Sequence, residues 1–175
     1  RYLQLVVIKI AGDTFDEATI AFLRKRYGLL VGQNTAETVK MTIGCVSERP
    51  EETSMLVKGR DLKTGLPKEQ MISSSELMEA YKRPARQIVD EVLAVLESSA
   101  PELVADIAQN GIVMTGGGSL LYGFDRLIEE RTDITCSIAD DADSCVAYGC
   151  GKSLQWINSM QEGTINIARR KLMKE

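Results

Sequence analysis

The sequence predicts an α/β protein, and three features of the chain lead to this class. Toward the C-terminal end, strand-like and helix-like stretches alternate, which is typical of a parallel sheet with crossover helices. An apolar run at residues 112–115 leads into Gly116, Gly117 and Gly118 and then into a helix-like pattern. The middle of the chain, about residues 32–82, is rich in turns and short strands, so an insertion with its own small antiparallel sheet is expected.

The first two elements are expected to be a strand and a helix. Residues 3–10 are aliphatic and β-branched, a composition that favours a strand. Apolar residues then recur at helical spacing over about residues 15–27, and basic residues in the last turn suit the helix dipole. Asp13 or Thr14 is expected to be the N-cap of this helix, and Gly28 to end it.

The inserted unit is expected to hold one helix and a hairpin. Asn34 or Thr35 is a suitable N-cap for the helix, and Gly44 is a suitable end. Residues 53–57 and 70–73 have strand-like compositions. Turn-forming residues separate these two runs, so the sequence predicts a hairpin or meander.

Long helices are expected to follow the inserted unit. Ser74 or Ser75 begins a helical pattern with a strong apolar stripe. Pro84 lies inside this pattern and lacks a backbone N–H, so we expect a break or kink there. Pro101 occupies the first position of a further helix that is expected to reach Gln109.

The last part of the chain is expected to contain helix, strand and helix. A helix is predicted over residues 120–130, with a possible interruption at Gly123. Residues 134–138 alternate like a strand. A further helix is expected from about residue 145 to residue 160, and residues 161–175 form a basic tail. A solvated terminal helix is the simplest interpretation of this tail, with a lipid- or partner-binding segment as the alternative.

Composition and charge exclude several classes of function. The net charge of −4 argues against a general nucleic-acid binder, so no nucleic-acid partner is expected. The chain has no histidine, which excludes Ser-His-Asp hydrolases and histidine-ligated metal sites. Its four cysteines form no C-x-x-C pair, so reduced thiols and no metal site are expected. The chain begins at Arg1, within a strand-like run, so we expect it to be the back part of a longer protein.

The glycine turn is the first candidate binding site. Three consecutive glycines leave no Cβ between the backbone and a ligand, and they permit positive φ angles. A turn from the carboxyl end of a strand into a helix is where open α/β sheets bind ligands. A tight turn without any ligand is the equally simple alternative. No pair of carboxylates could be assigned to a cleft, so no catalytic residue is predicted.

Glu37 and Lys40 form the second candidate site. They are three residues apart, so on a helix they share one face. An exposed ion pair between them is the simplest interpretation. As a binding site, the pair offers a carboxylate acceptor and an ammonium donor, which suit a ribose hydroxyl or an adenine edge.

Several stretches in order along the chain resemble the carboxyl-terminal half of MreB, the bacterial actin homologue, and its rod-shape-determining paralogues. They are Ile10-Ala-Gly-Asp13 with Asp16-Glu17, Thr35-Ala-Glu37 with Lys40 and Ile43-Gly44, Val57-Lys-Gly-Arg-Asp-Leu62 with Thr64-Gly-Leu-Pro67, Pro101-Glu-Leu103 with Asp106-Ile107, Val113-Met-Thr-Gly-Gly-Gly118, and Cys145-Val-Ala147 with Gly149 and Gly151-Lys152. Each motif is unspecific alone, whereas the ordered set over nearly residues 3–157 is specific.

The resemblance implies one lobe of the actin-like ATPase (ribonuclease H-like) fold. Such a lobe has a core sheet with flanking helices and a small α+β peripheral subdomain. Residues 1–31 and 83–160 would form the core subdomain, and residues 32–82 the peripheral one. The insertion expected from turn chemistry thus falls where the family has one.

The resemblance also implies the nucleotide-contacting residues. Glu37 and Lys40 match the family's ribose- and adenine-contacting helix, and Gly12 matches backbone close to the nucleoside. The adenosine loop of the family is matched by Gly116, Gly117, Gly118 and Ser119. The implied cofactor of the whole protein is ATP or ADP with Mg²⁺, whereas none is expected to bind this chain tightly.

The whole protein, as the resemblance implies, polymerises into filaments and determines cell shape by organising cell-wall synthesis. It would act in the cytoplasm at the inner face of the cell membrane, with cell-wall synthesis and membrane shape proteins as partners. The family's phosphate-binding elements, its water-positioning carboxylate, its magnesium-side acidic residue and its membrane-inserting elements match nothing in this sequence. Phosphoryl transfer needs these groups together, so we expect the chain alone to be inactive.

Two other classes share the implied fold. An Hsp70-type chaperone lobe has the same Glu-x-x-Lys helix, but residues 59–67 favour the filament-forming family. A sugar- or acetate-kinase lobe would need a substrate-side Asp or His, for which the sequence offers no candidate. A segregation or division actin is a further alternative, usually with different peripheral sequences.

Overall fold

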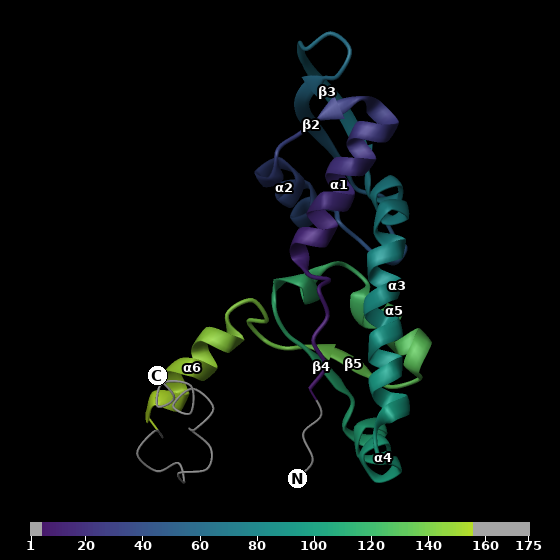
Figure 1. Cartoon of the computed structure of the whole chain (residues 1–175), viewed down its shortest axis with the longest axis vertical. Coiled ribbons are helices and arrows are strands. Elements are labelled where there is room, and N and C mark those ends of the chain that lie inside the picture. The colour runs from purple at the N-terminus through teal and green to yellow at the C-terminus, as the bar shows by residue number, and fades with distance from the viewer. Residues whose placement is uncertain (1–4, 156–175) are drawn as a thin grey trace, which may run out of the picture.

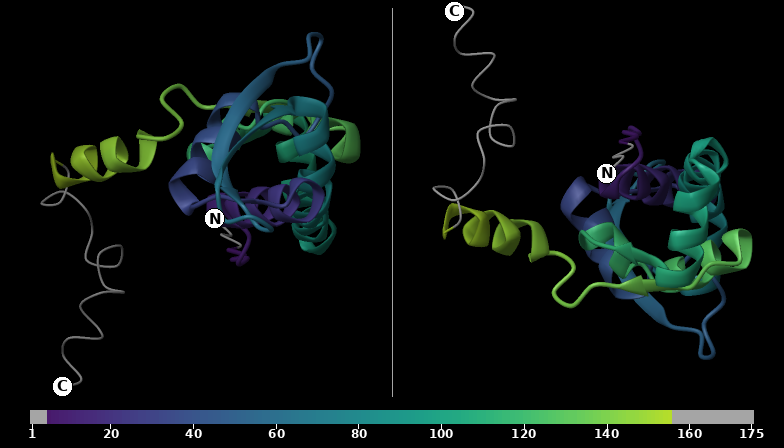
Figure 2. Two further views of the ribbon diagram at one scale, coloured as in Figure 1. Left: turned by 90° about the horizontal axis from the view of Figure 1, so that it is seen from above. Right: turned by 90° about the horizontal axis from the view of Figure 1, so that it is seen from below.

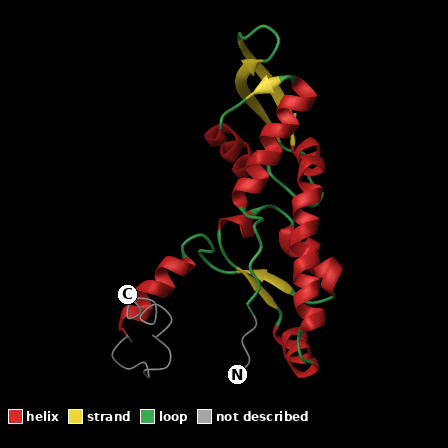
Figure 3. Cartoon of the chain, in the orientation of Figure 1, coloured by secondary structure: helices red, strands yellow, loops and turns green. Residues whose placement is uncertain are grey.

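The computed structural model describes residues 5–155, which form an elongated molecule with two separate sheets (Figures 1 and 3). An antiparallel sheet has the strand order β1-β2-β3, and a parallel sheet pairs β4 with β5. The elements are α1 (Gly12–Tyr27), β1 (Leu29–Leu30), α2 (Gln33–Ile43), β2 (Ser54–Asp61), β3 (Pro67–Ser73), α3 (Ser74–Ser98), α4 (Pro101–Asn110), β4 (Ile112–Met114), the 3-10 helix η1 (Gly117–Leu120), α5 (Phe124–Thr132), β5 (Cys136–Ile138) and α6 (Cys145–Gln155). The predicted α/β class is confirmed.

The segment before α1 is not a strand, so that prediction is wrong for residues 5–10. Leu5 and Val7 are 80% and 81% exposed. The physical reason is that strand propensity acts through pairing, and in the part of the chain that the structure describes no strand pairs with this segment.

The helices α1 and α2 form where the sequence predicts them, but their N-caps differ. Ala11 and Gly32 are the N-cap residues, not the polar residues expected. Thr14 lies in the first turn of α1, and its hydroxyl oxygen accepts a hydrogen bond from the backbone N–H of Ala11 at 3.3 Å. Gly28 ends α1 as predicted, in the left-handed conformation with φ +62°.

The predicted hairpin is confirmed, and both strands are longer than expected. β2 and β3 pair in antiparallel register from Ser54↔Ser73 to Arg60↔Pro67. Their inner face buries Val57 and Ile72. The short strand β1, which precedes the stretch predicted as the insertion, adds to the edge of β2.

The long helix α3 runs along one side of the molecule and is not broken at Pro84 (Figure 1). The expected interruption is therefore wrong. Pro84 is buried, and the neighbouring side chains of Tyr81 and Ala85 are buried as well. Packing of this face stabilises a helix that lacks one internal hydrogen bond.

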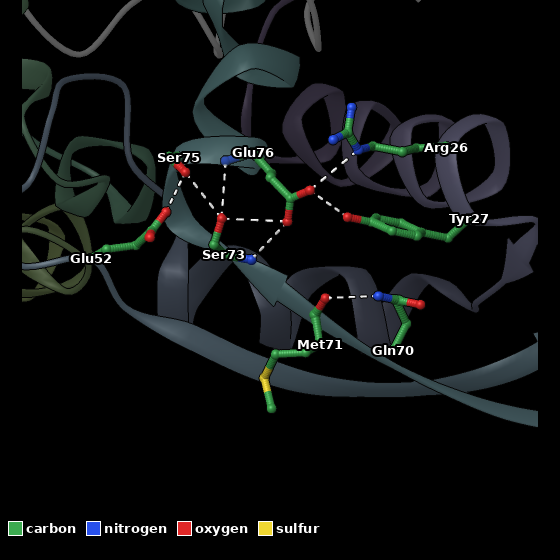
Figure 4. Close-up of polar contacts among 8 residues, drawn as sticks. All are labelled: Arg26, Tyr27, Glu52, Gln70, Met71, Ser73, Ser75 and Glu76. Carbon is green, nitrogen blue, oxygen red and sulfur yellow. Dashed lines mark hydrogen bonds and ion pairs between the residues drawn. The ribbon is translucent and has the colours of Figure 1, made fainter.

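A polar cluster joins the start of α3 to the end of α1 (Figure 4). The Ser73 hydroxyl accepts the backbone N–H of Glu76 at 3.4 Å, and the Glu76 carboxylate accepts the backbone N–H of Ser73 at 3.1 Å. This reciprocal pair is a capping box. Glu76 also accepts a hydrogen bond from the Tyr27 hydroxyl and lies 3.2 Å from Nε of Arg26. The cap thereby fixes two helices relative to each other.

The parallel pair β4–β5 confirms the crossover arrangement predicted for the last part of the chain. Ile112 pairs with Cys136, and Met114 with Ile138. The interruption predicted at Gly123 within the helix of residues 120–130 is confirmed, because Gly123 adopts a left-handed conformation with φ +79° and α5 begins at Phe124. Leu120 belongs to the 3-10 helix η1 before it.

The helix α6 extends away from the rest of the molecule in every view (Figures 1 and 2). Its predicted end near residue 160 and the basic tail, residues 161–175, lie outside the described residues. Between residues 5 and 155, no helix combines the length and the apolar character needed to cross a membrane.

Candidate functional site

Lys40 lies at the contact between α2 and α1, beside Gly12. Its ammonium nitrogen is 2.8 Å from Oδ1 of Asp16 and donates to the Gly12 carbonyl oxygen at 3.3 Å. The side chains of Lys40 and Asp16 are 13% and 3% exposed, so the ion pair is largely shielded from water. The structure thus brings together two of the predicted binding residues.

Glu37 does not pair with Lys40, so the exposed ion pair considered as an alternative is wrong. Lys40 points toward α1 because the same helix buries Ala36 and Val39 against the body of the molecule. Glu37 is exposed and forms no ion pair within residues 5–155. Its carboxylate therefore remains available to a ligand.

The glycine turn is held in shape by its own hydrogen bonds. Gly116 has a φ of +86°, and its N–H donates to the carbonyl of Ala142 at 2.6 Å. The backbone N–H and the hydroxyl of Ser119 donate to the Gly116 carbonyl at 3.0 and 2.7 Å. Ser119 is buried, so its hydroxyl closes the turn rather than facing outward.

The backbone at Gly117 and Gly118 is open on its outer side. No atom lies within 4 Å of the position that a Cβ would take at either residue. Both residues are exposed. A planar ring could therefore approach this backbone closely, as the family resemblance implies for an adenosine loop.

The end of the glycine turn is fixed against the segment that follows α2. Cys45 and Tyr122 form an isolated parallel bridge, and the N–H of Val46 donates to the Tyr122 carbonyl at 2.9 Å. The hydroxyl of Ser47 donates to the Gly123 carbonyl at 2.7 Å. These contacts link the turn to the helix that carries Glu37 and Lys40, although no hydrogen bond or ion pair among the described residues joins Glu37 to the turn itself.

Asp16 is the site residue to which the sequence alone assigned no role. It is 2% exposed, and its Oδ1 has no polar partner other than Lys40 among residues 5–155. Nε2 of Gln33 donates to Oδ2 at 3.5 Å, at the limit of a hydrogen bond. The signal in the sequence is a carboxylate on the buried face of an amphipathic helix, between Phe15 and Thr19.

The site has donors and acceptors but no nucleophile or metal centre in the described part of the chain. The nearby Cys45 is buried, which raises the pKa of its thiol, and the thiol donates to the Ser74 carbonyl at 3.3 Å. No group of three or more metal-ligating side chains occurs within residues 5–155. A separate hollow of about 490 Å³ lies between α3 and α5, and neither Gly12 nor Lys40 lines it.

The fold is that of actin-like proteins. The chain superposes on a structure described as the MamK double helical filament with a TM-score of 0.66 and 24% identity, a likeness that shows the fold alone. The crystal structure of MreB 5 of Spiroplasma citri bound to AMPPNP gives a TM-score of 0.83 at 38% identity, covering 87% of this chain and 46% of that one.

The chain belongs to the MreB/Mbl family, whose model matches residues 3–162. It is 43% identical over 151 residues to the cell shape-determining protein MreB of Escherichia coli, covering 86% of this chain and 44% of that protein. It is 37% identical over 147 residues to the cell shape-determining protein Mbl of Bacillus subtilis. The family resemblance is thus confirmed, and the chaperone and kinase alternatives are set aside. The chain spans about half the length of the curated relatives it matches.

Proposed function

We propose that this chain supplies the nucleoside-binding side of an ATP-binding actin-like protein that forms filaments and determines cell shape. The observation that carries the proposal is the anchored ammonium of Lys40 beside Gly12, on a helix linked to the open glycine turn. Two structures of a relative support it, because MreB5 of Spiroplasma citri was crystallised with AMPPNP and with ADP.

In this proposal each side of the site contacts a different part of the nucleoside. The backbone of Gly116, Gly117 and Gly118 lies against the adenine ring, and Ser119 contributes its backbone only. Glu37 accepts a hydrogen bond from a ribose hydroxyl. Gly12 and Lys40 border the same ligand from the other side.

The phosphates and Mg²⁺ of ATP or ADP are proposed to depend on parts of the protein outside this chain. Phosphoryl transfer requires positioned phosphates, a metal ion and a group that orients the attacking water. The described residues supply none of the acidic clusters that hold such a metal. We therefore propose that this chain alone binds nucleotide weakly and does not hydrolyse it.

Self-association into filaments is proposed to involve the β2–β3 hairpin. Leu62 and Leu66 at its tip are 43% and 65% exposed, and Leu56 and Met71 on its outer face are also exposed. Exposed apolar side chains grouped in this way are typical of protein–protein contacts. In the cell, filaments at the inner face of the membrane would organise cell-wall synthesis together with membrane shape proteins.

Calorimetry and sedimentation test the proposal. Titration of ATP into the purified chain should give at most weak binding, and phosphate release should not exceed that of buffer. A micromolar affinity or steady turnover would contradict the assignment of phosphate binding to other parts of the protein. Added to polymerising full-length protein, the chain should reduce the fraction of protein that pellets. The Leu66→Asp variant of the chain should reduce that fraction less. No change in pelleting with the unsubstituted chain would contradict the hairpin contact.

A further inference from the structure

We propose that Asp16 is the positioning residue of Lys40, and that it makes this side of the site select an uncharged acceptor over a phosphate. The inference rests on the proposed nucleoside site and adds the residue that sets its specificity. It follows from the geometry of one buried ion pair between α1 and α2.

Lys40 can offer a ligand only the N–H donors that its own contacts leave free. A lysine ammonium carries three N–H donors and no acceptor. One donor is directed at Oδ1 of Asp16, 2.8 Å away, and a second at the carbonyl of Gly12, 3.3 Å away. One donor therefore remains for a ligand, on a side chain that is 13% exposed.

The ion pair with Asp16 also sets the net charge that Lys40 presents to a ligand. Asp16 neutralises the ammonium at contact distance, and its own side chain is only 3% exposed. A neutralised ammonium attracts a multiply charged phosphate much less than a free one does, because the carboxylate repels the same anion. Its remaining N–H can still donate to a hydroxyl oxygen or a ring nitrogen, which are uncharged acceptors.

Asp16 also determines where the Lys40 ammonium lies. A lysine side chain has a flexible four-carbon stem, so an unanchored ammonium would sample many positions. Asp16 lies on α1, which packs closely on α2, and Gln33 donates to its second oxygen at 3.5 Å. The carboxylate is therefore fixed, and it fixes the ammonium beside Gly12.

The test compares two ligands on three forms of the purified chain. Adenosine and magnesium-free inorganic tripolyphosphate are titrated separately, followed by amide ¹H–¹⁵N spectra, which report weak affinities. The unsubstituted chain should bind adenosine more tightly than tripolyphosphate. Asp16→Asn should weaken adenosine binding about three- to tenfold, the range of one hydrogen bond, and should strengthen tripolyphosphate binding. Glu17→Gln, the same charge change at an exposed neighbour, should alter neither affinity.

A folded Asp16→Asn variant with both affinities unchanged would overturn the proposal. If that variant does not fold, the ammonium ¹H–¹⁵N signal of Lys40 in the unsubstituted chain tests the proposal instead. A slowly exchanging signal that shifts with adenosine supports the proposal, and a signal like those of exposed lysines overturns it. An unsubstituted chain that binds no adenosine overturns the proposed function itself, which is a distinct result.

Discussion

The hydroxyl groups of Thr19 and Tyr81 form a buried pair, and we expect the loss of both to cost less stability than the loss of the Thr19 hydroxyl alone. The two oxygens are 2.7 Å apart, and both residues are fully buried between α1 and α3. The Thr19 hydroxyl donates its one hydrogen to the Phe15 carbonyl at 2.9 Å. Tyr81 must therefore be the donor in the pair, and burial raises the pKa of its phenol, so it stays protonated.

The magnitudes follow from which group is left unpaired. Tyr81→Phe removes the donor and leaves Thr19 bonded to Phe15, so unfolding free energy should fall by about 1 kcal/mol. Thr19→Val keeps the side-chain shape but leaves the Tyr81 hydroxyl buried without an acceptor, which should cost about 2 kcal/mol. The double variant leaves neither hydroxyl buried without a partner, so adding Tyr81→Phe to Thr19→Val should restore about 1 kcal/mol of unfolding free energy.

Urea unfolding followed by circular dichroism at 222 nm measures all four forms. Tyr148→Phe is the matched control, because Tyr148 is 67% exposed and its substitution should change stability by less than about 0.5 kcal/mol. Simple additivity of the two single variants would refute the reasoning. So would a further loss of stability on adding Tyr81→Phe to Thr19→Val.

Three further predictions concern the helix cap, pH and the glycines. Ser73→Ala should lower the unfolding free energy by about 1 kcal/mol through loss of the α3 cap, and an unchanged urea midpoint would contradict the capping box. The backbone N–H groups of Thr64 and Lys63, with Lys68, lower the pKa of Asp61 to about 2, so its stabilising contribution should be lost as pH falls from about 4 toward 2. Acid unfolding curves of Asp61→Asn should lack that component, and parallel curves would argue against it. Gly123→Ala should destabilise the chain, because the φ of Gly123 is +79° and a Cβ there would lie 2.2 Å from the Ser47 hydroxyl oxygen. Gly117→Ala should leave stability unchanged, because no atom lies within 4 Å of the Cβ position, and it should weaken adenosine binding. Equal stability losses in the two glycine variants would refute this distinction.

Local chemistry was sufficient to predict most of the fold. Gly28 ends α1, Pro101 begins α4, and the turn-forming residues between β2 and β3 mark the hairpin, because each signal acts within a few residues. The predictions that proved wrong concern residues whose structure depends on contacts with distant parts of the chain. Residues 5–10 have strand propensity, but no strand pairs with them among the described residues. Pro84 is tolerated because it lies on the buried part of α3, together with Tyr81 and Ala85.

The sequence identified candidate residues of the site, but it did not reveal which residues contact one another in the fold. Lys40 was expected to face a ligand with Glu37, and the structure instead joins it to Asp16 on another helix. Helical spacing identifies neighbours on one helix, whereas the partner on a second helix depends on how the two pack. The hydroxyl of Ser119 likewise closes the turn, which follows from the fold of Gly116 and not from the motif.

An amide chemical-shift map of the chain titrated with adenosine tests the central claim most directly. The account predicts that the largest shifts fall on Gly116–Ser119 and on the turn of α2 that carries Glu37 and Lys40, with smaller shifts at Gly12. Tripolyphosphate at the same concentration should shift these amides much less. Shifts concentrated on the residues that line the hollow between α3 and α5, such as Arg86 and Leu127, would contradict the account.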